Sequence, residues 1–405
     1  PALPAEEVPL RLPLSALGGG FAAAAVAGLV VRPVARRLGL VARPRLWRAG
    51  AAAVPLMGGV AILAGLGAGV LAGGGLAVGP AGAVAAVGVV VLAVVGFLDD
   101  LTGLGPWTRL AWSAAAGAAA WLLGLRAVVL VGDGALDDIV NLAVTALWFV
   151  GVTHAINMLD NMDGSASGVA AVSAATIAVV AVLSGQWVVA VSASALTGGC
   201  LGYLVHNVHP ARVYMGDLGA LSLGFALAAL GLALRPGQTP PASFFVAVFA
   251  LGVPIFDTAL VSVSRLRDGR PVALGGTDHA AHRLRARGLG VTASAASLWG
   301  AQAMLGLAAV GVAVSGRGGA WVIIAAVALG GAAALAWFLR QPTWRAEGSQ
   351  DASAALLPPV DAAVDSLRSL LDSAALWESD PAAARLAEET MHRLARTRDA
   401  LRDET

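Results

Sequence analysis

The segment best suited to chemistry is HAINMLDNMDG, residues 154–164, which lies between two apolar runs. Asn157, Asp160 and Asn161 are three and four residues apart, so on a helix they would share one face. Asp163 and the glycine after it would then end the helix and turn the chain. Charge at the edge of an apolar run is costly unless a cation or a polar substrate meets it. The segment is therefore a candidate site for a metal ion and a phosphorylated ligand. The alternative is a helix cap with a solvated loop.

A second acidic motif is Asp99-Asp100, in GFLDDLTGLG at the end of another apolar run. Adjacent carboxylates repel each other unless a cation lies nearby. This arrangement suits a general base, or a pair that serves a divalent ion. The alternative is again a helix cap.

A third motif, VYMGDLGALSLG, places Asp217 between two glycines just before an apolar run. Glycine lets the backbone approach a ligand closely, and the start of the next helix favours anions. Magnesium in proteins is usually held by one or two carboxylates together with phosphate oxygens. The motif is therefore compatible with a Mg²⁺–phosphate site.

A basic segment, GGTDHAAHRLRARG, supplies His279, His282 and Arg283. Two histidines at this spacing could bind zinc, but no third ligand is evident nearby and the arginines disfavour a metal ion. Phosphate binding fits better, because arginine forks match phosphate oxygens and histidine donates to them. A basic loop beside a membrane is the remaining alternative. Arg48, which precedes the PLMGG motif, is a further candidate for substrate binding.

The composition predicts an all-α polytopic membrane protein. Of the 405 residues, 58% are hydrophobic and 13% are charged, and the mean hydropathy is +0.78. The single cysteine, Cys200, permits no disulfide within the chain. A net charge of +1 argues against a nucleic-acid partner.

A hydrocarbon layer about 30 Å thick needs roughly 20 apolar residues per helix. The sequence offers eleven candidate spans: about 12–31, 52–72, 81–98, 110–125, 139–158, 167–184, 187–205, 219–234, 242–264, 292–315 and 320–339. Residues 1–344 are thus expected to form a multi-pass domain, its first span retained in the membrane. Residues 345–405 are expected to form a helical extension of two amphipathic helices, the second capped by Asp380 with Pro381 at its first position.

The arginines predict the orientation of these spans in a cell membrane. If the loop after the first span is cytoplasmic, fourteen arginines lie in cytoplasmic loops, eight in the C-terminal tail and four outside. This bias places the N-terminus outside and the tail inside. All the acidic and basic motifs described above then fall on the cytoplasmic side, where they would line one active-site cleft.

Taken in order, these stretches resemble the motifs of the polyprenyl-phosphate N-acetylhexosamine-1-phosphate transferase family. The similar segments are PLMGG, FLDD, HAINMLDNMDG, VYMGDLGA, PIFDT and DHAAHRL, between about residues 45 and 290. The resemblance implies transfer of a sugar-1-phosphate from a UDP-sugar donor to a polyprenyl phosphate acceptor, with release of UMP and a requirement for Mg²⁺ or Mn²⁺. It implies a membrane enzyme that starts a lipid-linked cell-envelope glycan, and it leaves a homodimer open.

The resemblance also implies roles for individual residues. Asp217 and Asp99 would hold the metal. The residues expected to serve catalysis are Asp99, Asp100, Asp160 and Asp163. Those expected to bind substrate are Asn157, Asn207, Arg48, His279, His282 and Arg283.

The chain departs from the family pattern at four positions. His154 stands where Asn is frequent, Asn161 where Gly is frequent, Ala281 where many members have a middle histidine, and Gly50 where glucosamine-type members often have His. The missing triple histidine favours an N-acetylglucosamine-type donor over the phospho-N-acetylmuramoyl-pentapeptide alternative. A multi-span ion or lipid transporter, with Asp257 on its ion path, is the alternative of another class. Transporters place key charges near the midplane, however, whereas nearly all charges here lie at one rim.

The topology gives a first testable prediction. A cysteine introduced at position 285, with Cys200 replaced by alanine, should react with an impermeant thiol reagent only after the membrane is opened. A cysteine at position 317 should react in intact cells, because its loop is expected outside. Labelling of position 285 in intact cells would refute the proposed orientation.

Overall fold

The computed structural model describes residues 10–42, 54–75, 80–130, 134–272, 276–343, 349–372 and 380–404. In these ranges the regular structure is α-helical, apart from one isolated antiparallel β-bridge between Val41 and Pro55. The all-α class expected from the sequence is therefore confirmed. Arg48 lies outside the described residues.

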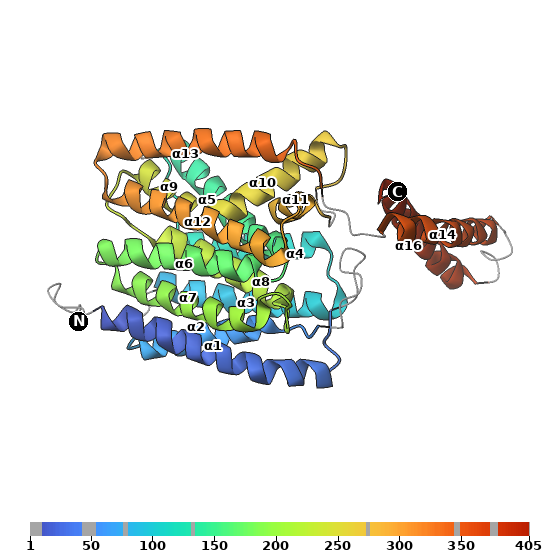
Figure 1. The fold of residues 1–405 in the computed structure, drawn as a ribbon, viewed down its shortest axis with the longest axis horizontal. Helices are drawn as coiled ribbons and strands as arrows, with labels where there is room; N and C mark the ends of the chain where they lie inside the picture. Colours follow the sequence, from blue (N-terminus) through green and yellow to red (C-terminus); the bar gives the residue numbers. More distant parts are fainter. Residues whose placement is uncertain are drawn as a thin grey trace. The chain divides into compact units, whose positions relative to one another are not determined.

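Two compact units divide the chain, and the first contains helices α1 to α13. These are α1 (Arg11–Arg37), α2 (Gly58–Ala72), α3 (Pro80–Thr102), α4 (Pro106–Leu122), α5 (Ala135–Leu159), α6 (Ser165–Leu183), α7 (Trp187–Asn207), α8 (Gly216–Ala233), α9 (Pro240–Ala250), α10 (Gly252–Arg267), α11 (Ala280–Ala286), α12 (Val291–Val314) and α13 (Arg317–Phe338). Within this unit α1 and α13 run along opposite edges, with the other helices between them (Figure 1).

The second unit contains α14 (Ser349–Leu371) and α16 (Pro381–Glu404), which pack against each other. Asp380 caps α16, because its Oδ1 accepts hydrogen bonds from the backbone N–H groups of Ala382 and Ala383 at 3.1 and 3.0 Å. The sequence prediction of a cap at Asp380 is confirmed. The placement of this unit in the cytoplasm stays a prediction.

The multi-pass character of the first unit is confirmed, although its spans are less uniform than expected. Eight of the described helices are long and apolar enough to cross a membrane, and a bent pair, α9 and α10, would make a ninth. The other two expected spans correspond to short helices, α2 with 15 residues and α4 with 17.

The expected span over residues 242–264 is broken, because the chain bends by 80° between α9 and α10. A buried side chain of α12 satisfies the backbone groups that this break leaves without helical partners. Gln302 accepts a hydrogen bond from Val253 N at 2.9 Å and donates to the carbonyl oxygens of Phe249 and Ala250 at 3.1 and 2.9 Å. Broken helices inside a membrane need such partners, since no water is available to provide them.

Close backbone contacts bring the beginning of α2 against the beginning of α8. Gly58 N donates to Tyr214 O at 2.9 Å, and Gly59 N donates to Met215 O at 3.0 Å. A Cβ atom on Gly59 would lie only 2.2 Å from the Cα atom of Gly219. The PLMGG and YMGD motifs, far apart in the sequence, are therefore one local structure.

The helix break leads to a second prediction. Gln302→Leu preserves much of the side-chain volume but removes three buried hydrogen bonds. Each buried group left unsatisfied costs about 1–3 kcal/mol. The variant should therefore unfold at a clearly lower temperature in detergent. Met304→Leu is the control on the same helix, because Met304 is 73% exposed. Equal midpoints for the two variants would contradict this role of Gln302.

Candidate functional site

The centre of the candidate site is a guanidinium group between two carboxylates. NH1 of Arg109, near the start of α4, donates to Oδ2 of Asp99 at 2.8 Å and to Oδ2 of Asp217 at 3.2 Å. Asp99 lies near the end of α3 and Asp217 in the first turn of α8. Two carboxylates that are remote in sequence thus share one cation.

The second oxygen of Asp217 is held by α5. Nδ2 of Asn157 donates to Oδ1 of Asp217 at 2.5 Å, so four helices converge on this cluster. Small residues allow the convergence: a Cβ on Gly96 of α3 would lie 2.2 Å from Asp217 O, and a Cβ on Gly224 of α8 would lie 2.7 Å from Thr153 Cα. The sequence prediction that places Asn157 and Asp217 in one site agrees with this geometry.

Asp100 has a different environment from its neighbour Asp99. Its two carboxylate oxygens accept hydrogen bonds from the backbone N–H groups of Asp217 and Leu218, at 2.9 and 3.1 Å. Met215, at the N-cap position of α8, makes no capping hydrogen bond through its own side chain. Asp100 thus caps α8 from another helix, which fixes the backbone of Asp217. This geometry supports a structural role for Asp100 and does not place it as the expected catalytic carboxylate.

The polar segment that follows α5 is folded differently from the single helical face expected. Helix α5 ends at Leu159, so Asp160 is the C-cap residue and Asn161 lies beyond the helix. Asp163 accepts hydrogen bonds at Oδ2 from Nδ1 of His209, at 2.8 Å, and from Ala211 N, at 3.1 Å. Asp163 therefore ties the turn after α5 to the loop after α7.

Asn207 stabilises the same turn from the end of α7. Its Oδ1 accepts hydrogen bonds from Gly164 N at 3.0 Å and Ser167 Oγ at 3.1 Å, and its Nδ2 donates to Val213 O at 3.1 Å. Only 2% of Asn207 is exposed. The expected contact of Asn207 with substrate is therefore not supported by its surroundings, which are protein groups that it joins.

The basic loop is organised around buried acidic residues. Asp278 accepts from Arg265 Nε at 3.0 Å and from both terminal nitrogens of Arg270, at 2.5 and 3.2 Å. Burial alone would raise the pKa of Asp278, but the hydrogen bonds from Arg270 and Arg265 outweigh burial and lower it. The pKa of Arg270 is raised by the same pairing. Because the folded-state pKa of Asp278 is the lower one, its contribution to stability is complete above about pH 4 and is lost as the pH falls further.

Arg283 does not present the free fork that the sequence analysis expected. Its Nε donates to Asp278 O at 2.9 Å, and its NH2 donates to Ser264 Oγ at 2.7 Å. Its NH1 donates to the carbonyl oxygens of Phe338 and Gln341, at 3.0 and 2.7 Å, at the end of α13. With four such bonds and 3% exposure, this guanidinium fastens the loop to α10 and α13.

His279, the N-cap residue of α11, faces an acidic side chain from α10. Its Nδ1 lies 2.7 Å from Oδ2 of Asp257, and its ring centroid lies 5.7 Å from that of His282. Asp257, in the PIFDT segment, is not among the site residues expected from the sequence.

The acidic cluster has the donor chemistry that a magnesium ion requires. Oδ2 of Asp99 and Oδ2 of Asp217 already surround one cationic group. The described residues include no group of three or more His, Cys, Asp or Glu side chains suited to a metal. Magnesium does not need such a group, because phosphate oxygens and water supply its other ligands. Asp217 retains 29% of its side-chain exposure and Asp99 only 5%, so Asp217 is the accessible member.

Arg109 is a further residue that the sequence did not indicate as part of the site. From the sequence it is only one of the cytoplasmic arginines, although it follows Asp99 by ten residues and lies at the start of the next helix. Its Nε is buried and makes no hydrogen bond to a described residue. The exposed part of Arg109, 23% of its side chain, lies beside the two carboxylates.

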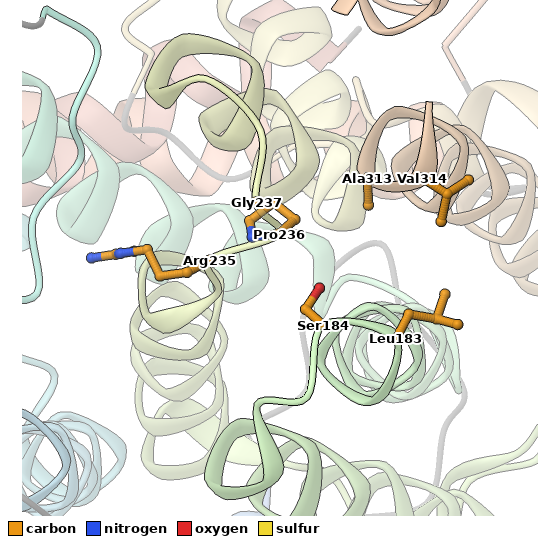
Figure 2. Close-up of a pocket in the computed structure, with 7 residues that line it drawn as sticks. All are labelled: Leu183, Ser184, Arg235, Pro236, Gly237, Ala313 and Val314. Carbon is orange, nitrogen blue, oxygen red and sulfur yellow. The ribbon is translucent and has the colours of Figure 1, made fainter. Parts of the chain in front are cut away.

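A cavity of about 310 Å³ lies elsewhere in the first unit (Figure 2). It is lined by Leu183, Ser184, Arg235, Pro236, Gly237, Ala313 and Val314. Figure 2 shows the side chain of Arg235 pointing away from the other labelled residues. Asp217 lies in the first turn of α8 and Arg235 follows its end, so the length of α8, 18 residues or about 27 Å, separates this cavity from the acidic cluster.

Comparison with known proteins identifies the family of the chain. Residues 83–235 match the model of Glycosyl transferase family 4, and this range contains Asp99, Arg109, Asn157 and Asp217. A probable undecaprenyl-phosphate N-acetylglucosaminyl 1-phosphate transferase of Bacillus subtilis (strain 168) is 30% identical over 264 residues, which is 64% of this chain and 74% of that protein. The chain belongs to glycosyl transferase family 4.

Shorter similarities link the chain to a second group of enzymes. A phospho-N-acetylmuramoyl-pentapeptide-transferase of Moorella thermoacetica is 45% identical over 92 residues, covering 23% of this chain and 29% of that protein. The enzyme of the same name from Heliobacterium modesticaldum is 46% identical over 89 residues, covering 22% and 28%. These matches are confined to less than a third of either relative.

The start of α8 yields a third prediction. Gly216 has a φ of +72°, and a Cβ there would lie 2.6 Å from Oδ2 of Asp100. Gly216→Ala should therefore disturb the cap on α8 as well as strain the backbone, by about 1–2 kcal/mol for the strain alone. Gly237→Ala is a matched control, because Gly237 has a φ of +76° and open space around it.

Thermal unfolding in detergent would measure both changes. Gly216→Ala should lower the midpoint by clearly more than Gly237→Ala. Equal shifts would mean that the Asp100 cap contributes nothing beyond the backbone strain.

Proposed function

We propose that the protein transfers N-acetylglucosamine-1-phosphate from its UDP derivative to a membrane polyprenyl phosphate and releases UMP. The observation that carries this proposal is the convergence of Asp99 and Asp217 on Arg109, with Asn157 holding the second oxygen of Asp217. Two carboxylates for a divalent cation beside a cationic donor suit a reaction between two phosphates. The resemblance to the Bacillus subtilis protein, whose name carries both the acceptor and the sugar, supports the same reaction.

In this reaction an oxygen of the polyprenyl phosphate attacks the β-phosphorus of the UDP-sugar. The bond between that phosphorus and the bridging oxygen breaks, and its electron pair leaves with UMP. Both reactants are anions, so the main requirements are charge neutralisation and alignment. Mg²⁺ bound by Asp217 and Asp99 would offset the negative charge of the diphosphate.

The other residues of the cluster then have definite tasks. Asn157 fixes the carboxylate of Asp217 so that one of its oxygens faces a cation. Arg109, whose side chain is 23% exposed beside the two carboxylates, would contact a phosphate oxygen of the donor or of the acceptor. Asp100 holds the backbone of Asp217 and Leu218 in place.

The phospho-N-acetylmuramoyl-pentapeptide donor is the second candidate, favoured by the high identity over the short matching region. We prefer N-acetylglucosamine because the similarity to the Bacillus subtilis protein extends over 74% of that relative, against 29% for the Moorella enzyme. The loop DHAAHRL also lacks the triple histidine that the second candidate would lead us to expect.

Purified protein, undecaprenyl or decaprenyl phosphate and a panel of UDP-sugars would test the proposal. UMP should appear with UDP-N-acetylglucosamine, should require Mg²⁺ or Mn²⁺, and should be accompanied by a lipid-linked sugar diphosphate. Release of UMP only with the muramoyl-pentapeptide donor would select the second candidate. No UMP with any donor would reject the transferase and revive the transporter alternative.

A fourth prediction concerns the proposed metal ligand. Asp217→Asn should lower the rate of UMP release by roughly a hundredfold or more, the loss typical of removing a group that stabilises transition-state charge. It should also weaken Mn²⁺ binding, measured by electron paramagnetic resonance without substrate. Asp138→Asn, in the first turn of α5, is the control and should change neither quantity. Retention of most activity in Asp217→Asn would place the metal elsewhere, for example on Asp99.

A further inference from the structure

Asp257 is an acidic side chain that the proposed chemistry does not use. It lies within α10, is 1% exposed, and accepts two short hydrogen bonds from one short stretch of chain. Its Oδ2 is 2.7 Å from His279 Nδ1, and its Oδ1 is 2.7 Å from Ala280 N. Burying a carboxylate costs free energy unless it is hydrogen-bonded or paired, so Asp257 requires a partner that compensates for its burial.

The hydrogen bond determines which nitrogen of His279 carries a proton. When Asp257 is an ionised carboxylate, its oxygens can only accept, so Nδ1 of His279 is then the donor. The second proton of the ring can then be taken up or given away only at Nε2. A carboxylate behind a histidine fixes the orientation of the ring and stabilises its positive form.

The surrounding contacts hold the backbone of this loop independently of the imidazole. Asp278, directly before His279, is paired with Arg265 and Arg270. Arg283, on the other side, is bonded to Ser264 and to the end of α13. The loop is thus anchored on both sides of the histidine. Asp257 is the group that contacts the imidazole ring itself.

We propose that Asp257 is a positioning residue that fixes the ring and the proton of His279, so that Nε2 meets the phosphates of the sugar donor. This proposal rests on the proposed function for the identity of the ligand. The geometry of the pair does not depend on that function.

Replacement of Asp257 by asparagine would move the ring proton of His279 from Nδ1 to Nε2. Ala280 N–H requires an acceptor, so the oxygen of the introduced carboxamide would take the place of Oδ1, and its NH₂ group would face His279. Nδ1 would have to accept that hydrogen bond, and the ring proton would move to Nε2. Asp257→Asn therefore changes the tautomer of His279 with almost no change in volume.

Nitrogen NMR of protein labelled with ¹⁵N-histidine would measure this directly, with His279→Gln used to assign the signal among the six histidines. Wild-type His279 should carry its proton on Nδ1, and the Asp257→Asn variant should carry it on Nε2. A wild-type ring with an unprotonated Nδ1 would overturn the proposal, even if the variant failed to fold.

Kinetics would show whether the arrangement serves the reaction. Asp257→Asn should lower kcat/KM for the UDP-sugar about tenfold to a hundredfold, as expected when a charge-assisted contact is lost. Asp257→Glu should recover part of this loss, because it restores the carboxylate. Asp268→Asn is the matched control, since Asp268 is exposed, follows the end of α10 and forms its ion pair with Arg270 instead of a histidine.

A double variant separates positioning from simple stability. If Asp257 acts through His279, Asp257→Asn combined with His279→Gln should be no slower than His279→Gln alone. Additive losses would overturn the proposal and make Asp257 a structural residue. If the wild-type protein released no UMP with any donor, the proposed function would fail, whereas the NMR result would still decide the geometry of the pair.

Discussion

The structure depends on neutralising acidic side chains among apolar helices. Three acidic residues are buried in the described part of the chain, and each has a positively charged or imidazole partner: Asp99 with Arg109, Asp257 with His279, and Asp278 with Arg265 and Arg270. Removing one member of such a pair leaves an uncompensated charge, which costs more than the pair contributes. The packing of α3, α4, α5 and α8 therefore follows from where these charges must meet.

Asp99 and Asp100 illustrate how helical geometry divides two identical side chains between tasks. Successive residues of a helix point about 100° apart. Asp99 is consequently directed to the guanidinium of Arg109, whereas Asp100 is directed to the backbone of α8. Of this acidic pair, Asp99 therefore neutralises a cation, whereas Asp100 holds the backbone at the start of α8. The two cannot exchange roles without a rotation of α3.

Much of this fold could be predicted from apolar run lengths, because each expected span contains a helix. The break at Leu251 could not, since the side chain that satisfies it, Gln302, comes from a helix much later in the chain. The residue types in the motifs likewise predicted that Asn157 and Asp217 belong to one site. It could not foresee that Asn207 and Arg283 bind protein groups, because amide and guanidinium donors serve backbone carbonyls as readily as ligands. Arg109 could not be identified as a site residue, because nothing in its sequence context distinguishes it from the other arginines that predict the orientation of the spans.

The short separation between Asp99 and Arg109 has a consequence for the order in which the chain enters the membrane. Helices α3 and α4 are joined by three residues, so this ion pair can form as soon as the ribosome has delivered α4. Asp217 is synthesised much later, after α5, α6 and α7, and joins a pair that already exists. The acidic centre can therefore assemble in two stages, with the first carboxylate already paired within its own helical hairpin before the second carboxylate arrives.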